Sequence, residues 1–189
     1  MASIGEVLSR ALTPSRPDPP LPEGIPAAVV VPLLDLRDPA VVFTKRTDLV
    51  SYHKGEISFP GGGRHPEDPD LLATALRETE EELGIPREAI EIAGTLPPTP
   101  TVATRYVIVP FVGILSERPE MIPSPVEIAE VIELRLERLI DVERAVEGVG
   151  PDGIARSWFA YELDGYLVWG ATGRILHGLI DVLRKEGWT

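Results

Sequence analysis

The chain has 189 residues, which is enough for one domain whose hydrophobic core needs no disulfide or metal to support it. The absence of Cys excludes disulfides, thiolate metal sites and Cys nucleophiles, and 18 basic against 30 acidic residues (net charge −12) argue against a nucleic-acid partner. No apolar run approaches the roughly 20 residues of a membrane span and no secretory signal opens the chain, so we expect a cytoplasmic protein without membrane contact.

The chain begins with a predicted short helix and a Pro-rich segment. Residues 3–12 favour a helix, and residues 14–26 contain six prolines in thirteen positions, which is typical of an extended segment. We therefore expect residues 1–26 to form an N-terminal helix and a Pro-rich lead-in. Residues 27–189 are then expected to form a single main domain.

The main domain opens with predicted strands that lead into a Gly-rich loop. β-branched and apolar residues favour a buried strand at residues 27–36 and a second strand at residues 40–45. A short strand at residues 56–59 leads into residues 60–63, a Pro-Gly-Gly-Gly loop in which the backbone can adopt unusual angles.

A helix is clearly predicted after this loop. Asp68 can cap it, Pro69 suits its first position, and Asp70 lies near the positive end of the helix dipole. Gly84 followed by Pro86 ends it. Apolar or small residues at helical spacing mark its buried face: Leu72, Ala75, Leu76, Thr79 and Leu83.

The rest of the chain alternates between predicted strands and helices. Strands are expected at residues 90–96, 106–115, 129–136, 157–163 and 166–169, and helices at residues 137–146 and 172–185. Asp164-Gly165 is a type I′ hairpin signal. The mixture predicts an α/β fold, with a mixed sheet and helices packed on its faces.

Three glutamates of the predicted helix carry the clearest chemical signal. Glu78, Glu81 and Glu82 fall within about 100° of arc on one helical face, away from the apolar stripe, so we expect their carboxylates to stay open. Their repulsion costs roughly 0.2–0.5 kcal/mol per pair, and a bound divalent cation would remove that cost. An acidic, solvated helix face is the simpler alternative; the preceding Gly-rich loop and Arg77 favour a site.

The segment from Arg77 to Ile85, R-E-T-E-E-E-L-G-I, resembles the core of the Nudix box, R-E-U-x-E-E-x-G-U, in which U is apolar. Thr79 takes a usually aliphatic position, and the outer Glu of the box is missing, with Asp68 or Asp70 as a stand-in. The resemblance implies a Nudix-type mixed β-sheet sandwiched between helices. It also implies Mg²⁺- or Mn²⁺-dependent cleavage of a pyrophosphate bond in a small nucleotide-type substrate.

A second resemblance narrows the choice of substrate. Residues 42–62 are similar to the segment L-L-T-x-R-[SA]-x₃-R-x₃-G-x₃-F-P-G-G that precedes the box in the coenzyme A pyrophosphatase branch. The spacing is preserved, although Ser51 replaces the second Arg of that pattern. This resemblance implies hydrolysis of coenzyme A to 3′,5′-ADP and 4′-phosphopantetheine, with coenzyme A thioesters as further candidate substrates.

The resemblance also suggests roles for individual residues. Glu78, Glu81 and Glu82 would hold the metal, with Glu81, Glu82, Arg77 and Glu127 as the catalytic set. Glu127 is the nearest match to a family glutamate that completes the metal site or acts as general base; a solvated loop carboxylate is its alternative. The candidates for substrate binding are Arg46, His53, Gly61, Gly62, Gly63 and Arg64, and Arg46 could instead touch a site carboxylate.

Several alternatives stay open from the sequence. Ser51 leaves room for ADP-ribose, a dinucleotide or a nucleoside triphosphate as substrate. A catalytically silent nucleotide-sensing module and a protein-interaction domain are alternatives of other classes. Enzymes of this superfamily are often dimers, so a homodimer stays open, and the sequence does not decide the oligomeric state. Tyr52 and Tyr106 are candidates for stacking on a base, whereas we expect Trp158, Phe159 and Trp169 in the core.

Overall fold

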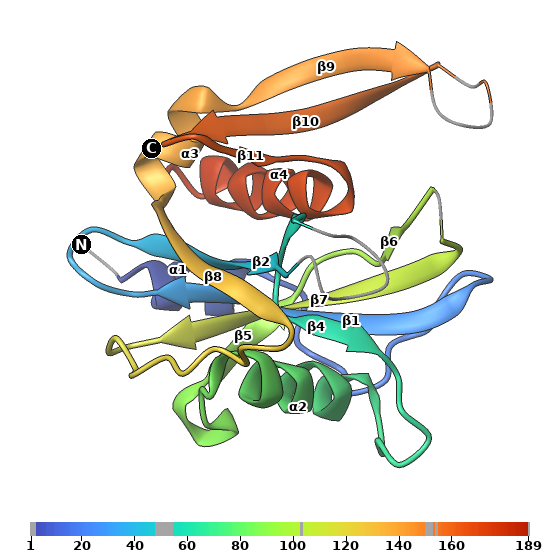
Figure 1. Cartoon of the computed structure of the whole chain (residues 1–189). Coiled ribbons are helices and arrows are strands. Elements are labelled where there is room, and N and C mark those ends of the chain that lie inside the picture. Colours follow the sequence, from blue (N-terminus) through green and yellow to red (C-terminus); the bar gives the residue numbers. More distant parts are fainter. Residues whose placement is uncertain (1–2, 48–54, 103, 150–152, 154, 189) are drawn as a thin grey trace.

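A mixed β-sheet forms the centre of the molecule (Figure 1). The computed structural model describes residues 3–47, 55–102, 104–149, 153 and 155–188. The main path of the sheet runs β3-β2-β1-β7-β5, with β4 on β1, β6 on β7 and β8 on β2. β1 and β7 pair in parallel, and the other pairs are antiparallel. The strands are β1 (Ile25–Leu34), β2 (Ala40–Arg46), β3 (Ile57–Ser58), β4 (Gly61–Gly63), β5 (Glu91–Thr95), β6 (Thr99–Pro100), β7 (Tyr106–Leu115) and β8 (Ile128–Arg135).

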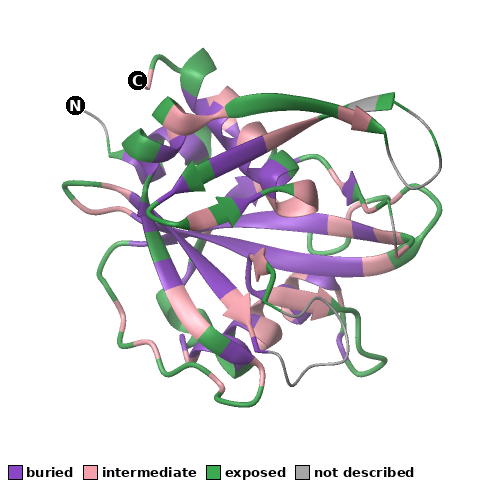
Figure 2. Ribbon diagram, turned by 45° about the horizontal axis from the view of Figure 1, so that its top comes forward, coloured by how far each residue is buried: buried purple, intermediate pink, exposed green. Residues whose placement is uncertain are grey.

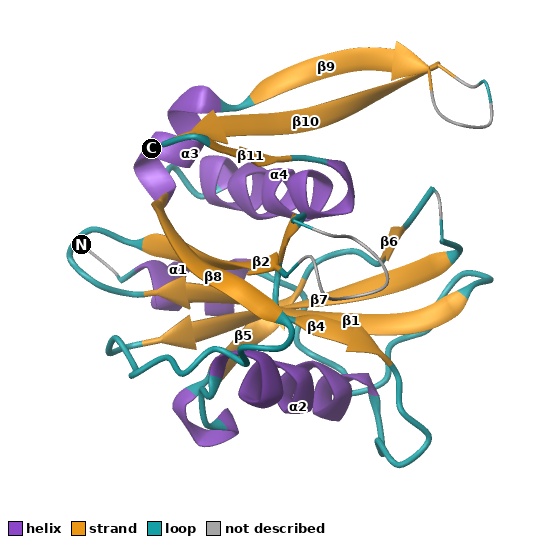
Figure 3. Cartoon of the chain, in the orientation of Figure 1, coloured by secondary structure: helices purple, strands orange, loops and turns teal. Residues whose placement is uncertain are grey.

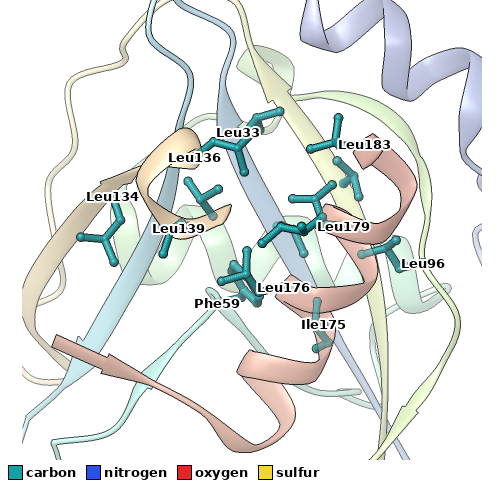
Figure 4. Close-up of a cluster of buried hydrophobic side chains, with 14 of the residues drawn as sticks. Leu33, Phe59, Leu96, Leu134, Leu136, Leu139, Ile175, Leu176, Leu179 and Leu183 are labelled. Atoms are coloured by element: carbon teal, nitrogen blue, oxygen red, sulfur yellow. The ribbon is translucent and has the colours of Figure 1, made fainter. Parts of the chain in front are cut away.

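Helices cover both faces of this sheet, which confirms the predicted α/β fold (Figure 3). The helix α2 (Leu71–Leu83) packs on one face, and α1 (Ile4–Ala11) and α4 (Gly170–Lys185) pack on the other. Leucines and isoleucines of α4 meet Leu33, Phe59 and Leu96 from the sheet side in the larger core (Figure 4). None of the described helices is long and apolar enough to cross a membrane.

A smaller sheet lies beyond α4 and makes a further layer (Figure 1). It consists of β9 (Arg144–Val149), β10 (Ala155–Leu163) and β11 (Tyr166–Val168), and it follows the short helix α3 (Leu136–Val142). The helix predicted for residues 137–146 is therefore too long, because from Arg144 the chain pairs with β10 instead. The predicted hairpin is confirmed, with positive φ angles of 53° at Asp164 and 84° at Gly165.

The strands of the central sheet are largely buried, whereas β9 is largely exposed (Figure 2). Of the three aromatic side chains expected in the core, Trp158 and Phe159 of β10 are half-buried. Trp169 is 57% exposed, because it precedes the first turn of α4 instead of lying in β11. The expectation for Trp169 was therefore wrong.

The N-terminal segment packs closely on the rest of the chain. Ile4 and Leu8 of α1 are fully buried in the same core as α4, and Ser3 with Glu6 forms a capping box at the start of α1. Further along, the carbonyl of Pro17 accepts a hydrogen bond from the Leu72 amide, and Asp18 binds Arg64. The Pro-rich segment thus reaches the start of α2.

Two local predictions around the Gly-rich segment were wrong. The helix α2 begins at Leu71 and is capped by Asp70, whose side chain accepts a hydrogen bond from the Ala73 amide at 2.8 Å; Asp68 and Pro69 precede the helix. Residues Gly61–Gly63 form the strand β4 along β1, although we expected a loop there. The predicted end of α2 is confirmed, because Gly84 adopts the left-handed conformation with φ 68°.

Candidate active site

The strand β4 lies directly against α2, and its glycines make this close approach possible. Gly61 has φ +149°, and a Cβ there would lie 2.3 Å from the Ala28 carbonyl oxygen, so no side chain fits. A Cβ at Gly62 would lie 2.8 Å from the carboxyl carbon of Glu78. The backbone of the Gly-rich segment therefore runs beside the carboxylates of the helix.

Glu82 is the most deeply buried of these carboxylates. It is 2% exposed, accepts a hydrogen bond from the Gly61 amide at 3.2 Å, and lies 3.3 Å from Nη1 of Arg46. Burial raises the pKa of Glu82 to about 7; Gly61 and Arg46 oppose the rise, and nearby Glu78 adds to it. The expectation that all three carboxylates stay open was wrong for Glu82, because β4 and Arg46 cover it.

Arg77 connects the other two glutamates of the helix. Its Nη2 lies 3.0 Å from Oε1 of Glu78, and its Nη1 lies 2.9 Å from Oε2 of Glu81. The Glu81 side chain is 59% exposed, whereas that of Glu78 is 19% exposed, and burial raises the pKa of Glu78. The three glutamates thus differ in solvent access although they share one helical face.

Asp68 holds the opposite side of the Arg77 guanidinium. Asp68 Oδ1 lies 2.9 Å from Arg77 Nε, and Asp68 Oδ2 accepts hydrogen bonds from Arg77 Nη2, the Thr74 hydroxyl and the His65 amide. Arg77 holds the pKa of Asp68 well below its usual range, and Asp68 in turn raises the pKa of Arg77. Of the two stand-ins considered from sequence, Asp68 contacts Arg77 and Asp70 caps the helix.

The loop between β7 and β8 brings Glu127 near these carboxylates. The amide of Ser124 donates to the Glu82 carbonyl and the amide of Ile122 donates to the Leu83 carbonyl, so the loop is fastened to the end of α2. The carbonyl of Glu127 accepts a hydrogen bond from the Thr47 amide at 2.9 Å. The negative charge of Glu127 contributes to the raised pKa of both Glu78 and Glu82.

The carboxylate oxygens of this site suit a hard divalent cation, although they do not converge on one point. Within the described residues, no group of three or more Asp, Glu or His side chains is arranged closely enough to hold one metal ion. Glu78 and Glu82 are nevertheless half-buried or buried next to further negative charge, which leaves them destabilised. A cation on these oxygen ligands would relieve both the burial cost and the repulsion.

The remaining candidates from the sequence divide into three groups. Arg46 reaches the site, where its guanidinium donates a hydrogen bond to Glu82. The Arg64 guanidinium is directed to Asp18 at 3.1 Å and to the Pro69 carbonyl at 2.7 Å. His53, like Ser51, lies outside the described residues. The partner Asp18 was missed, since nothing in the Pro-rich segment marks one acidic residue as a ligand of a residue 46 positions away.

Comparison with known sequences finds one family over most of the chain. The family described as "NUDIX domain" matches residues 24–155. A protein of Photorhabdus laumondii named "Uncharacterized Nudix hydrolase NudL" is 32% identical over 154 residues, which cover 81% of this chain and 82% of that protein. A protein of the same name from Enterobacter sp. is 36% identical over 158 residues, 81% of this chain and 80% of its own length.

Solved structures share the fold at low sequence identity. A MutT/nudix family protein from Enterococcus faecalis has a TM-score of 0.56 at 17% identity, with 97% of this chain and 70% of that chain covered. RenU, a Nudix hydrolase from M. smegmatis, has a TM-score of 0.53 at 21% identity, with 68% and 81% covered. These similarities agree with the sheet and helices described above.

Proposed function

The chain belongs to the Nudix hydrolase family, and we propose that it hydrolyses the pyrophosphate bond of coenzyme A, giving 3′,5′-ADP and 4′-phosphopantetheine. Thioesters of coenzyme A are further substrates in this proposal. The family as a whole supports a metal-dependent enzyme acting on small nucleotide derivatives. The choice of coenzyme A rests on the chain's own segment before the box.

One observation supports this choice above the others: two residues of the segment that resembles the coenzyme A branch contact the buried carboxylate. Arg46, from the Arg position of that pattern, lies 3.3 Å from Glu82, and Gly61, from its Pro-Gly-Gly end, donates its amide to the same carboxylate. Groups that orient the substrate at the reacting bond can contribute to its selection. The contacts of Arg46 and Gly61 with Glu82 therefore support a role for this segment in substrate choice.

We assign the metal to the three glutamates of α2. Glu78, Glu81 and Glu82 supply carboxylate oxygens, the ligands that Mg²⁺ or Mn²⁺ prefers, and Arg77 holds Glu78 and Glu81 on one side of the helix. When bound, the cation supplies charge neutralisation at the pyrophosphate and lowers the pKa of a coordinated water. In this proposal the carboxylate of Glu127 accepts the proton of the attacking water.

The chain has a net charge of −12, which repels the negative phosphates of the substrate. Binding them therefore requires local positive or polar groups. In this proposal the backbone of Gly61, Gly62 and Gly63 lies along the pyrophosphate, where the absence of side chains permits close approach. Arg46, Arg64 and His53 supply the side-chain contacts. Arg46 is the best placed of these, because it already borders the carboxylates.

Product analysis by chromatography tests the proposal directly. The purified protein with Mg²⁺ or Mn²⁺ is offered coenzyme A, ADP-ribose, a dinucleoside polyphosphate and NADH in parallel, with the variant Glu82→Gln as the matched control. Release of 3′,5′-ADP from coenzyme A well above turnover of the others is expected, and it should be absent with the variant.

The other outcomes lead to different assignments. A preference for ADP-ribose would keep the assignment as a hydrolase and change the assigned substrate. Ser51, which replaces an Arg of the coenzyme A pattern, favours this alternative. The Nudix domain of Shewanella oneidensis NrtR was solved with ADP ribose. Tight binding of a nucleotide without metal-stimulated turnover would indicate a sensing module.

A further inference from the structure

A cavity of about 320 Å³ opens at the end of β4, beyond the glycines that border the carboxylates. Three elements form it: the start of β1, the residues after β4 and the first residue of β7. Its lining is mainly apolar, with basic and imidazole groups at one side: Ile25, Pro26, Gly63, Arg64, His65, Pro66 and Tyr106. An apolar cavity with a few polar groups is the usual form of a small-molecule site.

β4 lies between the cavity and the candidate active site, because Gly62 faces α2 whereas Gly63 faces the opposite side of the sheet. Gly61 donates to Glu82, Gly62 faces Glu78, and Gly63 lines the cavity. A strand advances about 3.3 Å per residue, so roughly 7 Å separates Gly61 from Gly63. This separation corresponds to the span from a pyrophosphate, across one ribose, to its base.

Tyr106 is the aromatic wall of this cavity, and the backbone holds it in a defined position. A Cβ at Gly63 would lie 3.6 Å from Tyr106 Cε1, so the edge of the ring lies within van der Waals reach of this glycine. The Tyr106 amide donates to the Thr101 hydroxyl at 3.0 Å, and its carbonyl accepts from the Thr101 amide at 2.8 Å. The preceding residue, Arg105, has φ +59°, which is unfavourable for a residue with a side chain.

Strain of this kind, of order 1–3 kcal/mol, persists where the surrounding structure requires it and clusters at ligand sites. Here the turn at Arg105 directs Tyr106 toward Gly63, and the Arg105 carbonyl accepts a hydrogen bond from the Ile25 amide. The aromatic wall is therefore set before any ligand arrives. A preset aromatic ring loses little entropy when a planar group stacks on it.

We propose that this cavity binds the adenine ring of the substrate, stacked on Tyr106 beside the prolines Pro26 and Pro66. The pyrophosphate then lies over Gly61 and Gly62, beside the carboxylates, and the ribose passes the edge of β4 between them. The inference deepens the proposed function and rests on it for the choice of an adenine nucleotide. Stacking on an aromatic side chain contributes about 1–3 kcal/mol per base, equivalent to roughly 5- to 150-fold in affinity.

Ligand binding without metal tests this subsite separately from turnover. The probes are 3′,5′-ADP, 5′-AMP and 4′-phosphopantetheine, each titrated in the presence of chelator. Binding is followed by saturation-transfer NMR, through the adenine H2 and H8 signals of the nucleotides and the methyl signals of 4′-phosphopantetheine. Tyr106→Leu keeps an apolar side chain and removes the ring, whereas Tyr106→Phe keeps the ring. We expect Tyr106→Leu to weaken both adenine nucleotides about 10-fold or more, Tyr106→Phe to change them less than about 3-fold, and 4′-phosphopantetheine to be unaffected.

Each contrary result has a distinct meaning. Equal adenine affinity in Tyr106→Leu and the wild type, no binding of either adenine nucleotide to the wild type, or a loss confined to 4′-phosphopantetheine would each overturn the subsite. Circular dichroism and thermal unfolding test whether Tyr106→Leu is folded. If it is not, the Tyr106 ring signals of the wild type, identified by their absence from Tyr106→Phe, are followed during titration with 5′-AMP, and signals that do not shift would overturn the subsite. A protein that binds 5′-AMP through Tyr106 but leaves coenzyme A intact would refute the proposed substrate and keep the subsite.

Discussion

Asp68 and Arg77 form a two-point ion pair, with Oδ1 to Nε at 2.9 Å and Oδ2 to Nη2 at 3.0 Å. The pair joins the segment before α2 to the middle of the helix, and it leaves Arg77 Nη1 free to bind Glu81. Because a guanidinium is planar, fixing one edge on Asp68 also fixes the direction of the other edge. The geometry of the carboxylate site thus depends on a residue outside the helix.

Replacing Asp68 with Asn should destabilise the protein by about 2–3 kcal/mol and lower turnover. Breaking a buried ion pair costs roughly 3–5 kcal/mol, and we reduce this because the Arg77 side chain is 27% exposed. Denaturant unfolding measures the loss. Asp70→Asn is the matched control, because Asn caps a helix about as well as Asp. Equal stability of the two variants would contradict the assignment.

The stabilisation by Asp68 should also depend on pH. Arg77 lowers the pKa of Asp68 in the folded protein, whereas the unfolded value is about 3.9. A lowered folded pKa gives stability that is fully present above the unfolded pKa and is lost as the pH falls toward the folded pKa. The difference in unfolding free energy between wild type and Asp68→Asn should therefore be constant from pH 7 to about pH 5 and shrink below about pH 4. Urea unfolding across that range measures it, and a gap that widens in acid would exclude this mechanism.

Glu82→Gln should lose activity without losing stability. Burial raises the pKa of Glu82 in the folded protein to about 7, whereas the unfolded value is about 4.3. Ionisation of Glu82 therefore lowers the stability of the metal-free protein as the pH rises above the unfolded pKa. Gln removes that charge, and we expect unchanged or higher thermal stability in chelator at pH 8, together with a loss of turnover by orders of magnitude.

Glu80→Gln is the control for this prediction. Glu80 lies on the same helix, but its side chain is 44% exposed and pairs with Arg87, away from the site. It should keep turnover within about 2-fold. A Glu82→Gln variant that remains active, or a Glu80→Gln variant that is equally inactive, would refute the special role of Glu82.

Local signals account for the parts of the structure that were predicted correctly. The end of α2 follows from Gly84, and the β10–β11 hairpin follows from Asp164-Gly165, because these residues tolerate the backbone angles that the turns require. The alternation of helices and strands also predicted the mixed sheet. The box motif also singled out Arg77, which contacts Glu78 and Glu81 in the structure.

Tertiary contacts account for the parts that were not predicted. The burial of Glu82 depends on β4 and Arg46, which lie 21 and 36 residues away in sequence, so helical periodicity alone left it open. Asp68 and Asp70 both suit a helix start, and only the fold assigns one to Arg77 and the other to the cap. β9 was missed because pairing with β10 overrides the helical tendency of the residues after α3.

Divalent metal should stabilise the wild type and not Glu82→Gln. A ligand that binds only the folded state at 100 times its Kd adds about 2.7 kcal/mol, which for a chain of this length raises Tm by roughly 5–10 °C. Thermal unfolding with Mg²⁺ or Mn²⁺, against NaCl of equal ionic strength, measures the shift, and chelator should reverse it. An equal shift in Glu82→Gln would place the cation elsewhere on this acidic protein.

Gly61 and Gly62 should respond differently to the same small substitution. At Gly61 a methyl group would meet the Ala28 carbonyl oxygen at 2.3 Å and the Val29 Cα at 2.6 Å, both backbone atoms that cannot move away, and the φ of +149° is itself unfavourable for Ala. Gly61→Ala should therefore unfold at a markedly lower denaturant concentration, with a loss of about 3 kcal/mol or more.

At Gly62 the nearest atoms are the carboxyl group of Glu78, at the end of a flexible side chain. Gly62→Ala should keep most of the stability, because Glu78 can rotate, but it should lower turnover, because the rotated carboxylate leaves its place beside Arg77. Denaturant unfolding and steady-state kinetics on both variants separate the two effects. The assignment requires a stability defect at Gly61 and an activity defect with normal stability at Gly62; the reverse pattern would show that β4 does not position the carboxylates.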